Sequence, residues 1–445
     1  MATETRETRA MPETREPITL DDARWQKVLD ATGGWAAACY QCGVCSGVCP
    51  WGRVRGPDAP PVSVRHMVRS AQLGLGADVM PADAPLWLCT TCRLCEVRCP
   101  RGVPVTDVVL GLRELAWKEP WLQERVPPAL AGVLWDVHFD GNPWGQPPSR
   151  RAAWARDLGL AAFNPAAHEA LYYVGCTAAY DTRAQHVARA LVNVLQTAGV
   201  AFGTLGEQEP CCGDAAHSFG HKGYFGELIE TNTRLLLEKA GVSEGSKPEK
   251  PFTLVTTSPH CFDVFANHYP RLAGVFRPLH YTQYLAELID SGRLTFPTPL
   301  PMRVTFHDPC VLGRGNGEYE APRRVLAAIP GVDLVEMTEN REGALCCGGG
   351  GGRMWLETPI EDRFGQVRVR QADQTGAAVL ATACPYCISC LEDAIKIEAS
   401  KDGTPPDPDG MKVLDIAEVA WLALFADQAP AAGRERAARV SGGAR

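Results

Sequence analysis

The sequence lacks the segments that would direct a chain out of the cytoplasm or into a membrane. Residues 1–17 are rich in Thr, Glu and Arg and contain no apolar core, which argues against a secretory signal peptide. The longest apolar stretch, Val413 to Ala426, is too short for a membrane span and carries Asp415 and Glu418, so we expect an amphipathic helix there. These absences predict a cytoplasmic protein, with membrane association through a partner subunit left open.

Positive charge and nucleotide motifs are also scarce. The chain has 44 Lys and Arg against 52 Asp and Glu, a formal charge of −8, which argues against a nucleic-acid partner. No Lys-Ser or Lys-Thr pair follows the glycine run Gly348–Gly352, and no GxGxxG occurs in a strand–helix context. Without a flavin or nicotinamide motif, a redox reaction here would need a partner protein to supply or collect electrons.

Cysteine, by contrast, is abundant, with 18 residues. Cysteines at this density indicate disulfides or metal, and the expected compartment favours metal. One string occurs twice, first as Cys39-x2-Cys42-x2-Cys45-x3-Cys49-Pro50 and then as Cys89-x2-Cys92-x2-Cys95-x3-Cys99-Pro100. This is the bacterial ferredoxin pattern for two [4Fe–4S] clusters, in which the fourth cysteine of each string ligates the other cluster. Zinc is disfavoured because zinc sites usually combine separate CxxC pairs.

The ferredoxin rule assigns the eight ligands. Cluster one takes Cys39, Cys42, Cys45 and Cys99, and cluster two takes Cys89, Cys92, Cys95 and Cys49. A helix is expected between the two strings, from Val62 to Leu75. This insertion resembles the dicluster module of fumarate reductase iron–sulfur subunits and of heterodisulfide reductases.

A second repeat fills the rest of the chain. Cys176, Cys211–Cys212–Gly213 and Ser258-Pro259-His260-Cys261 are matched by Cys310, Cys346–Cys347–Gly348 and Cys384-Pro385-Tyr386-Cys387. Each unit reads as a short apolar strand that ends near a cysteine, followed by helices, the double cysteine and another strand. The expected helices are Arg183 to Ala198, Tyr224 to Lys239, Ala321 to Ile329 and Ile360 to Thr375. Alternating strands and helices predict parallel sheets, with the cysteines at the carboxyl ends of the strands.

The second unit resembles the CCG domain of the heterodisulfide reductase family, in which five cysteines hold a noncubane [4Fe–4S] cluster. The matching cysteines are Cys310, Cys346, Cys347, Cys384 and Cys387. A dicluster module followed by two CCG units resembles the D-subunit of heterodisulfide reductase, and is similar to the catalytic subunit of the DsrMK-type sulfite-reduction complex and to glycolate oxidase iron–sulfur subunits. The strings 307–314, 346–355 and 381–387 look most like iron–sulfur proteins thought to pass electrons from electron-transfer flavoprotein to menaquinone.

The first unit departs from this pattern, because Ser258 stands where the second unit has Cys384. Only Cys176, Cys211, Cys212 and Cys261 remain as metal ligands. Four thiolates cannot reproduce a five-cysteine site. They could hold a further [4Fe–4S] cubane or a zinc ion, or be a metal-free relic.

Several other residues near these cysteines carry two interpretations. His307 is a candidate proton donor or tuner of the cluster, or a satisfied core histidine, and Asp308 a cap of the next helix. Arg353 would hold an acidic group or pair with a local acid. Gly348–Gly352 is best explained by crowding beside the cluster ligands. Cys390 lies outside the five-cysteine pattern and reads as a spare core cysteine.

These observations predict an α+β multidomain protein and an iron–sulfur oxidoreductase. The domain boundaries that we expect are an N-terminal tail at 1–34, a mainly helical dicluster domain at 35–117, a connector at 118–165, a degenerate α/β CCG domain at 166–298, a second CCG domain at 299–427 and a C-terminal tail at 428–445.

The resemblance implies that electrons pass through the two cubanes to a centre whose catalytic residues are Cys310, Cys346, Cys347, Cys384, Cys387 and His307. A disulfide or thiol would then be the substrate. The alternative is a relay between electron-transfer flavoprotein, or another flavoprotein, and a quinone-reactive cytochrome b-type membrane subunit, with no small-molecule substrate. A structural zinc scaffold is a third interpretation, which the doubled ferredoxin string disfavours.

Overall fold

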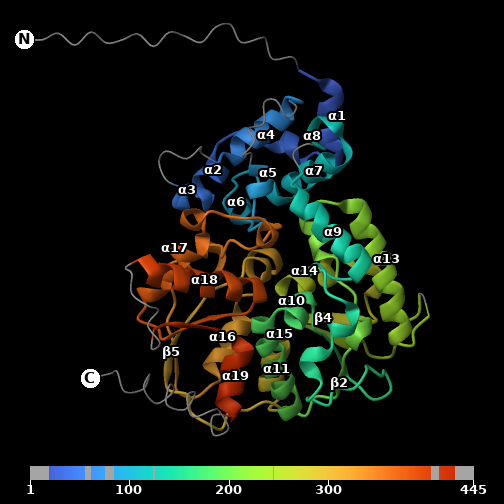
Figure 1. Cartoon of the computed structure of the whole chain (residues 1–445), viewed down its shortest axis with the longest axis vertical. Helices are drawn as coiled ribbons and strands as arrows, with labels where there is room; N and C mark the ends of the chain where they lie inside the picture. The colour runs from blue at the N-terminus through green and yellow to red at the C-terminus, as the bar shows by residue number, and fades with distance from the viewer. Residues whose placement is uncertain are drawn as a thin grey trace, which may run out of the picture.

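The computed structural model describes residues 20–55, 62–75, 85–123, 126–243, 245–401 and 410–425. In Figure 1 a helical module (blue) lies at one end of the molecule and two α/β units (green to yellow, and orange to red) lie side by side below it. None of the described helices is long and apolar enough to cross a membrane. The terminal segments 1–17 and 428–445 lie outside the described residues.

The N-terminal module is built from short helices around the cysteine loops. Its helices are α1 (Asp22–Ala31), α2 (Val44–Val48), α3 (Trp51–Val54), α4 (Val64–Gln72), α5 (Pro85–Leu88), α6 (Leu94–Val97), α7 (Val105–Lys118) and α8 (Pro120–Gln123). The helix expected at 62–75 is α4, which begins at its capping residue Ser63. Helix α1, within the segment predicted as the N-terminal tail, packs against α4 and α7 of the module.

The first α/β unit contains a four-stranded parallel sheet in the order β2-β1-β3-β4. Its strands are β1 (Ala170–Tyr173), β2 (Phe202–Gly203), β3 (Phe252–Thr256) and β4 (Phe276–His280). Its helices are α10 (Cys176–Tyr180), α11 (Thr182–Thr197), α12 (Asp214–Ser218), α13 (Lys222–Lys239), α14 (Pro259–His268) and α15 (Tyr281–Asp290), and α9 (Pro128–Asp140) precedes the unit. The helices expected at 183–198 and 224–239 are α11 and α13.

The second unit repeats this topology, with strand order β6-β5-β7-β8. Its strands are β5 (Met302–Phe306), β6 (Val332–Leu334), β7 (Val379–Thr382) and β8 (Lys412–Asp415), and its helices are α16 (Glu320–Ala327), α17 (Phe364–Asp373), α18 (Pro385–Lys401) and α19 (Ile416–Phe425). Helices α16 and α17 lie where helices were expected. The expected parallel sheets and the internal repeat are therefore confirmed.

The segment expected to form one amphipathic helix from Val413 to Ala426 is different. Its first residues complete strand β8, and α19 begins only at Ile416. Half of the residues of α19 are buried, because the helix packs against α11 of the first unit. Arg183 on α11 reinforces this contact through ion pairs with Glu392 and Glu418. The two α/β units thus share one hydrophobic core.

Candidate metal centres

Cluster one of the sequence assignment corresponds to a hollow in the N-terminal module. Cys39, Cys42, Cys45 and Cys99 all line it. Gly43, with φ of 88°, begins α2 and lets the loop turn between Cys42 and Cys45. Cys42 is exposed, unlike the other seventeen cysteines. The structure therefore brings together the three cysteines of the first string and the last cysteine of the second.

The other four cysteines of the two strings also gather. Cys49 lies close enough to Cys89 and Cys92 for their charges to raise its pKa, which burial raises further, to about 12 in all. Burial raises the pKa of Cys89 to about 11, although Arg113 opposes the shift. The pKa of Cys95 is raised by burial and by the same neighbours. The second predicted ligand set is thus assembled in one buried place.

The five cysteines of the second α/β unit form a continuous chain of sulfur contacts. Cys310 contacts Cys346, and Cys346 contacts Cys347. The Cys387 thiol donates to the Cys347 sulfur at 3.3 Å, and Cys384 hydrogen-bonds Cys387. Gly348 N–H donates to the Cys346 sulfur at 3.3 Å. All five come from loops or helix starts at the carboxyl ends of β5 and β7 or from the double-cysteine loop, as the sequence predicts.

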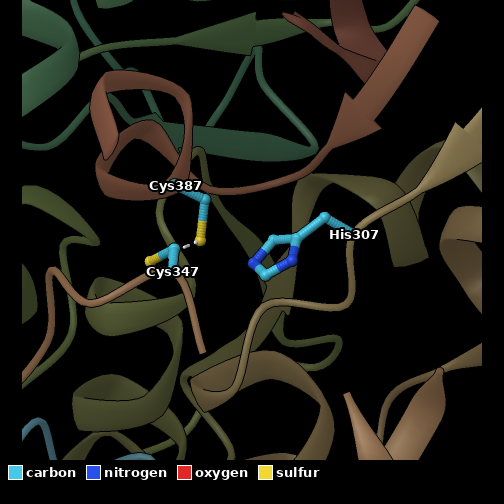
Figure 2. Close-up of side chains that lie close together, drawn as sticks. All are labelled: His307, Cys347 and Cys387. Carbon is cyan, nitrogen blue, oxygen red and sulfur yellow. Dashed lines mark hydrogen bonds between the residues drawn. The ribbon is translucent and has the colours of Figure 1, made fainter. Parts of the chain in front are cut away.

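His307 faces this group of sulfurs from the end of β5 (Figure 2). One of its ring nitrogens and the sulfurs of Cys347 and Cys387 all lie within 4.8 Å of one another. The Arg368 Nε donates to His307 Nδ1 at 3.0 Å, so the proton of the neutral ring sits on Nε2. Nε2 is buried and has no hydrogen-bond partner among the residues that the structure describes. Burial, with help from Arg368 and Arg314, holds the pKa of His307 well below its usual range.

His307 is therefore a neutral N–H donor without an acceptor in the described part of the chain. The interpretation of His307 as a satisfied core histidine is wrong, because a satisfied histidine would have both nitrogens paired. Asp308 does not cap a helix. Its carboxylate pairs with Arg323 at 2.7 Å and accepts from Arg341 N–H at 2.8 Å.

The first unit holds a similar but smaller set. Cys176, Cys211, Cys212 and Cys261 are buried and follow one another in contact. Ser258 caps α14 by accepting from His260 N–H at 3.2 Å, and it occupies the place of the fifth cysteine. Arg151 donates to the Cys176 sulfur at 3.5 Å and pairs with buried Glu209 at 2.7 Å. A Cβ on Gly175 would lie 3.2 Å from the Cys261 sulfur.

The sets of cluster two and of the second unit meet directly. Cys92 hydrogen-bonds Cys346, and this contact is the main reason why the pKa of Cys92 is raised. The Thr90 hydroxyl lies 3.7 Å from the Cys346 sulfur. The two sets of cysteines therefore adjoin without an intervening layer of protein.

The glycine run makes this close approach possible. A Cβ on Gly350 would lie 2.5 Å from the Thr90 carbonyl oxygen, and one on Gly351 would lie 2.3 Å from that of Cys89. A Cβ on Gly352 would lie 2.9 Å from the Phe219 ring. The prediction that crowding explains the run agrees with these distances, although the crowding comes from another domain.

Arg113 on α7 closes the junction of all three parts. It is fully buried and donates only to main-chain carbonyls, those of Leu86 and Cys89 in the module, Ser218 in the first unit and Gly351 in the second. Burial lowers its pKa to about 10, so the side chain stays charged at neutral pH. Sequence reasoning missed Arg113, since nothing in the sequence marks it out from the other arginines.

Two further residues are placed differently from expectation. Arg353 forms no ion pair within the described ranges; it donates to the Glu357 carbonyl and the Thr358 hydroxyl. Cys390 is half-buried, lies 3.8 Å from the Met354 sulfur, and lines a cavity of about 280 Å³ together with Cys347 and Arg353. This cavity opens beside the five-cysteine set.

Comparisons with known proteins agree with this architecture. The family model "Cysteine-rich domain" (CCG) matches residues 170–265 and 304–392, and the model "4Fe-4S dicluster domain" matches residues 35–103. The D-subunit of the dihydromethanophenazine:CoB–CoM heterodisulfide reductase of Methanosarcina barkeri is 31% identical, over 80% of this chain and 88% of its own length. The chain belongs to the CCG-domain family of iron–sulfur oxidoreductases.

Other relatives of this CCG-domain protein are longer. The probable iron–sulfur-binding oxidoreductase FadF of Bacillus subtilis is 32% identical over 86% of this chain and 59% of its own length. The EtfAB:quinone oxidoreductase of Syntrophomonas wolfei is 32% identical over 78% of this chain and 47% of its own length. The chain thus spans about half to three fifths of the length of these two relatives.

The donor atoms fit iron–sulfur clusters. A buried set of thiols with raised pKa values needs positive charge to become thiolates, and iron supplies that charge. Hydrogen bonds from Cys387 and His260 lower the pKa of Cys384 to about 5 against the effect of burial, so one thiolate is already favoured. The unpartnered His307 Nε2–H points at the sulfurs, where a cluster would supply the missing acceptor. The close approach of Gly175 leaves room for sulfur and not for a side chain.

Proposed function

We propose that this chain carries electrons one at a time between an external redox protein and the second CCG centre, by way of two [4Fe–4S] cubanes. Cys39, Cys42, Cys45 and Cys99 would hold the first cubane, Cys49, Cys89, Cys92 and Cys95 the second, and Cys310, Cys346, Cys347, Cys384 and Cys387 a noncubane [4Fe–4S] cluster. Such clusters accept and release single electrons when bound. The observation that carries the proposal is the contact between Cys92 and Cys346.

The protein around these sites supports that order. Electron tunnelling falls steeply with distance, so direct contact between two ligand cysteines favours transfer between their sites. The half-buried Arg314 donates to the Cys92 carbonyl and the Ala344 carbonyl, and so fixes the two loops relative to each other. Because Thr90 and the glycine run exclude side chains and solvent from the contact, little reorganisation would accompany a transfer.

The exposed edge of cluster one is the natural entry for a partner. Around Cys42 lie the exposed side chains of Tyr40 and Val44 and the arginines Arg65 and Arg101. Arg65 and Arg101 line the hollow at Cys42, and none of the described residues that line it is acidic. On a chain with a net charge of −8, this edge favours an acidic redox partner such as a flavoprotein.

At the other end, the 280 Å³ cavity beside Cys347 favours a small-molecule substrate. Its volume is near the lower end of the range usual for small-ligand sites. A disulfide that reached Cys347 would take two successive electrons and two protons and leave as two thiols. His307 would donate a hydrogen bond at this centre, since its Nε2–H has no other acceptor.

The alternative is a relay to a quinone-reactive membrane subunit, without a small-molecule substrate. The observation in its favour is the similarity to longer relatives, one of which is named EtfAB:quinone oxidoreductase. Both functions use the same order of sites up to the second CCG centre. They differ in whether a thiol or disulfide binds there.

The test uses the full chain, purified without oxygen. About 12 irons per chain are expected for three clusters of the [4Fe–4S] type. Cys92→Ser should leave the second CCG centre bound while slowing its reduction by an electron donor that docks at cluster one. Cys390→Ser, which removes a nearby thiol outside the ligand set, is the matched control. Fast reduction in Cys92→Ser would refute the proposed order.

A second measurement separates the two functions. An EPR signal of the oxidised second centre that changes on adding a thiol or disulfide supports disulfide chemistry. A signal indifferent to both supports the relay. Less than about 8 irons per chain, with stoichiometric zinc in their place, would contradict both.

A further inference from the structure

Three side chains outside the cysteine sets face one another beneath the N-terminal module. His217 is on α12, and Asp263 and His268 are on α14. One donor atom from each of the three lies within 4.8 Å of the other two. No hydrogen bond among the described residues uses a ring nitrogen of His217 or His268. Two imidazoles and a carboxylate therefore converge, while the imidazole nitrogens remain available.

The packing around the three residues holds them in place. The rings of His217 and His268 lie 4.4 Å apart between centroids, and both pack against Phe225 at 4.9 and 5.5 Å. Asp263 Oδ1 accepts from Asn267 at 3.0 Å and from Asn316 at 2.9 Å. These two amides fix the carboxylate through one oxygen and leave Oδ2 for another partner. Carboxylate ligands of metals are commonly oriented in this way.

The charges near the three residues suit a cation. Burial, together with the neighbouring His268, lowers the pKa of His217 to about 4, and burial also lowers the pKa of His268. Both rings are therefore neutral at physiological pH, which is the form that binds metal. Asp214 and Asp107 add negative charge, and Arg93 adds positive charge. His260, which lines the adjoining cavity and pairs with Asp214 at 3.2 Å, is a second positive group, because Asp214 raises its pKa well above the usual value against the effect of burial.

A small cavity adjoins the group. It has a volume of about 30 Å³ and is lined by His217, Asp263, Asp214 and Arg93 among others. That is enough for a single ion or water molecule and too little for an organic ligand. Thr91 of the module and Gly315 of the second α/β unit line the same cavity, so it lies where the three parts of the protein meet.

We propose that His217, Asp263 and His268 form a binding site for one divalent transition-metal ion, distinct from the cysteine sites. Two imidazoles and one carboxylate are a donor set for Zn²⁺, Fe²⁺ and similar ions, and they leave coordination positions open to water. The ion joins α12 to α14 within the first α/β unit, beside a cavity that Thr91 of the module also lines. It thereby stabilises this part of the first unit, independently of electron transfer.

The experiment uses the full chain with its clusters loaded, treated with chelator and then dialysed against Zn²⁺ or Co²⁺ without oxygen. The wild-type protein is expected to bind one more divalent ion per chain than His217→Gln, a difference that does not count any zinc held by the four cysteines of the first unit, and to melt at a higher temperature when the ion is present. His217→Gln and His268→Gln should each weaken binding at least about tenfold. His186→Gln, which changes an exposed histidine on α11, is the matched control and should bind as the wild type does.

A variant outside the donor set keeps the test decisive if the histidine variants fail to accumulate. Asn316→Ala removes one of the two amides that orient Asp263, so affinity should fall about 10-fold or more while the iron content stays unchanged. The proposal is overturned if the wild type takes up no additional ion, or if His217→Gln or Asn316→Ala binds it as tightly as the wild type. Because iron content and cluster reduction are measured separately, failure here leaves the proposed redox function untouched.

Discussion

Arg113 should contribute more to stability than any surface arginine, because it ties three parts of the protein together. Arg113→Met keeps most of the side-chain volume and removes the charge and the donors. Four buried carbonyl oxygens, at 2.5 to 2.9 Å from the guanidinium, would lose their partner. An unpaired buried polar group costs about 1–3 kcal/mol, and relief from burying the cation offsets part of the sum. We expect a net loss of about 3–5 kcal/mol.

The assay is urea unfolding of the cluster-loaded chain, followed by cluster absorbance and by tryptophan fluorescence. With an m-value of about 3 kcal/mol per M, the midpoint should fall by about 1–2 M. Arg113→Lys keeps the charge but loses the forked set of N–H donors, so its unfolding midpoint should lie between those of the wild type and Arg113→Met. Arg277→Met is the matched control, since Arg277 pairs with Glu287 on the surface and should matter by less than about 1 kcal/mol. The reasoning is refuted if Arg113→Met and Arg277→Met unfold at the same midpoint.

Three further predictions follow from single contacts. Burial raises the pKa of Asp415 to about 8, so the folded state keeps a proton that the unfolded state releases above about pH 4. The free energy of unfolding should therefore fall by up to about 1.4 kcal/mol per pH unit as the pH rises to 8. In Asp415→Asn the melting temperature should depend less on pH between pH 6 and 8 than it does in the wild type. Gly351→Ala places a Cβ 2.3 Å from the Cys89 carbonyl oxygen at a residue with φ of 59°, so it should destabilise the chain and slow reduction of the second CCG centre. Gly223→Ala, in open space on α13, should do neither. Equal melting curves and reduction rates for the two variants would contradict the crowding argument. Arg368→Met removes the donor to His307 Nδ1, so the reduction potential of the second CCG centre should fall by about 20–60 mV. The potential should also become dependent on pH, because the pKa of His307 rises when Arg368 is removed. If a redox titration of Arg368→Met matches that of the control Arg370→Met, the tautomer of His307 is unimportant for the potential.

Much of the fold could be predicted from local signals. Val304 and Thr305 in β5, and Leu254 and Val255 in β3, are apolar or β-branched runs that lead to a cysteine, so strand and ligand positions followed together. The four edge strands β2, β4, β6 and β8 were missed. Phe202–Gly203 and Val332–Leu334 are very short, Phe276–His280 contains Arg and Pro, and Lys412–Asp415 runs directly into the apolar helix α19. In each case the tertiary position of an edge strand overrides the local pattern.

The sequence predicted which cysteines gather but not what surrounds them. Short spacings between cysteines place them in one loop, so the sets could be expected from the sequence. Arg368 lies 61 residues from His307, and Arg113 lies 238 residues from Gly351, and no local rule relates such positions. The contact between Cys92 and Cys346 is likewise a property of domain docking, which spacing within each motif cannot specify.

The glycine run has a consequence for how the protein matures. Residues 350–352 pack closely on the Cys89–Thr90 loop and on Phe219, and Cys92 and Cys346 keep only 8% and 1% of their surfaces exposed. We therefore expect iron and sulfide to be delivered to these two places more readily before the interface closes than after it. In that case cluster insertion into the separate parts would precede their closure, and a chain that closed early would be slow to acquire metal at its centre.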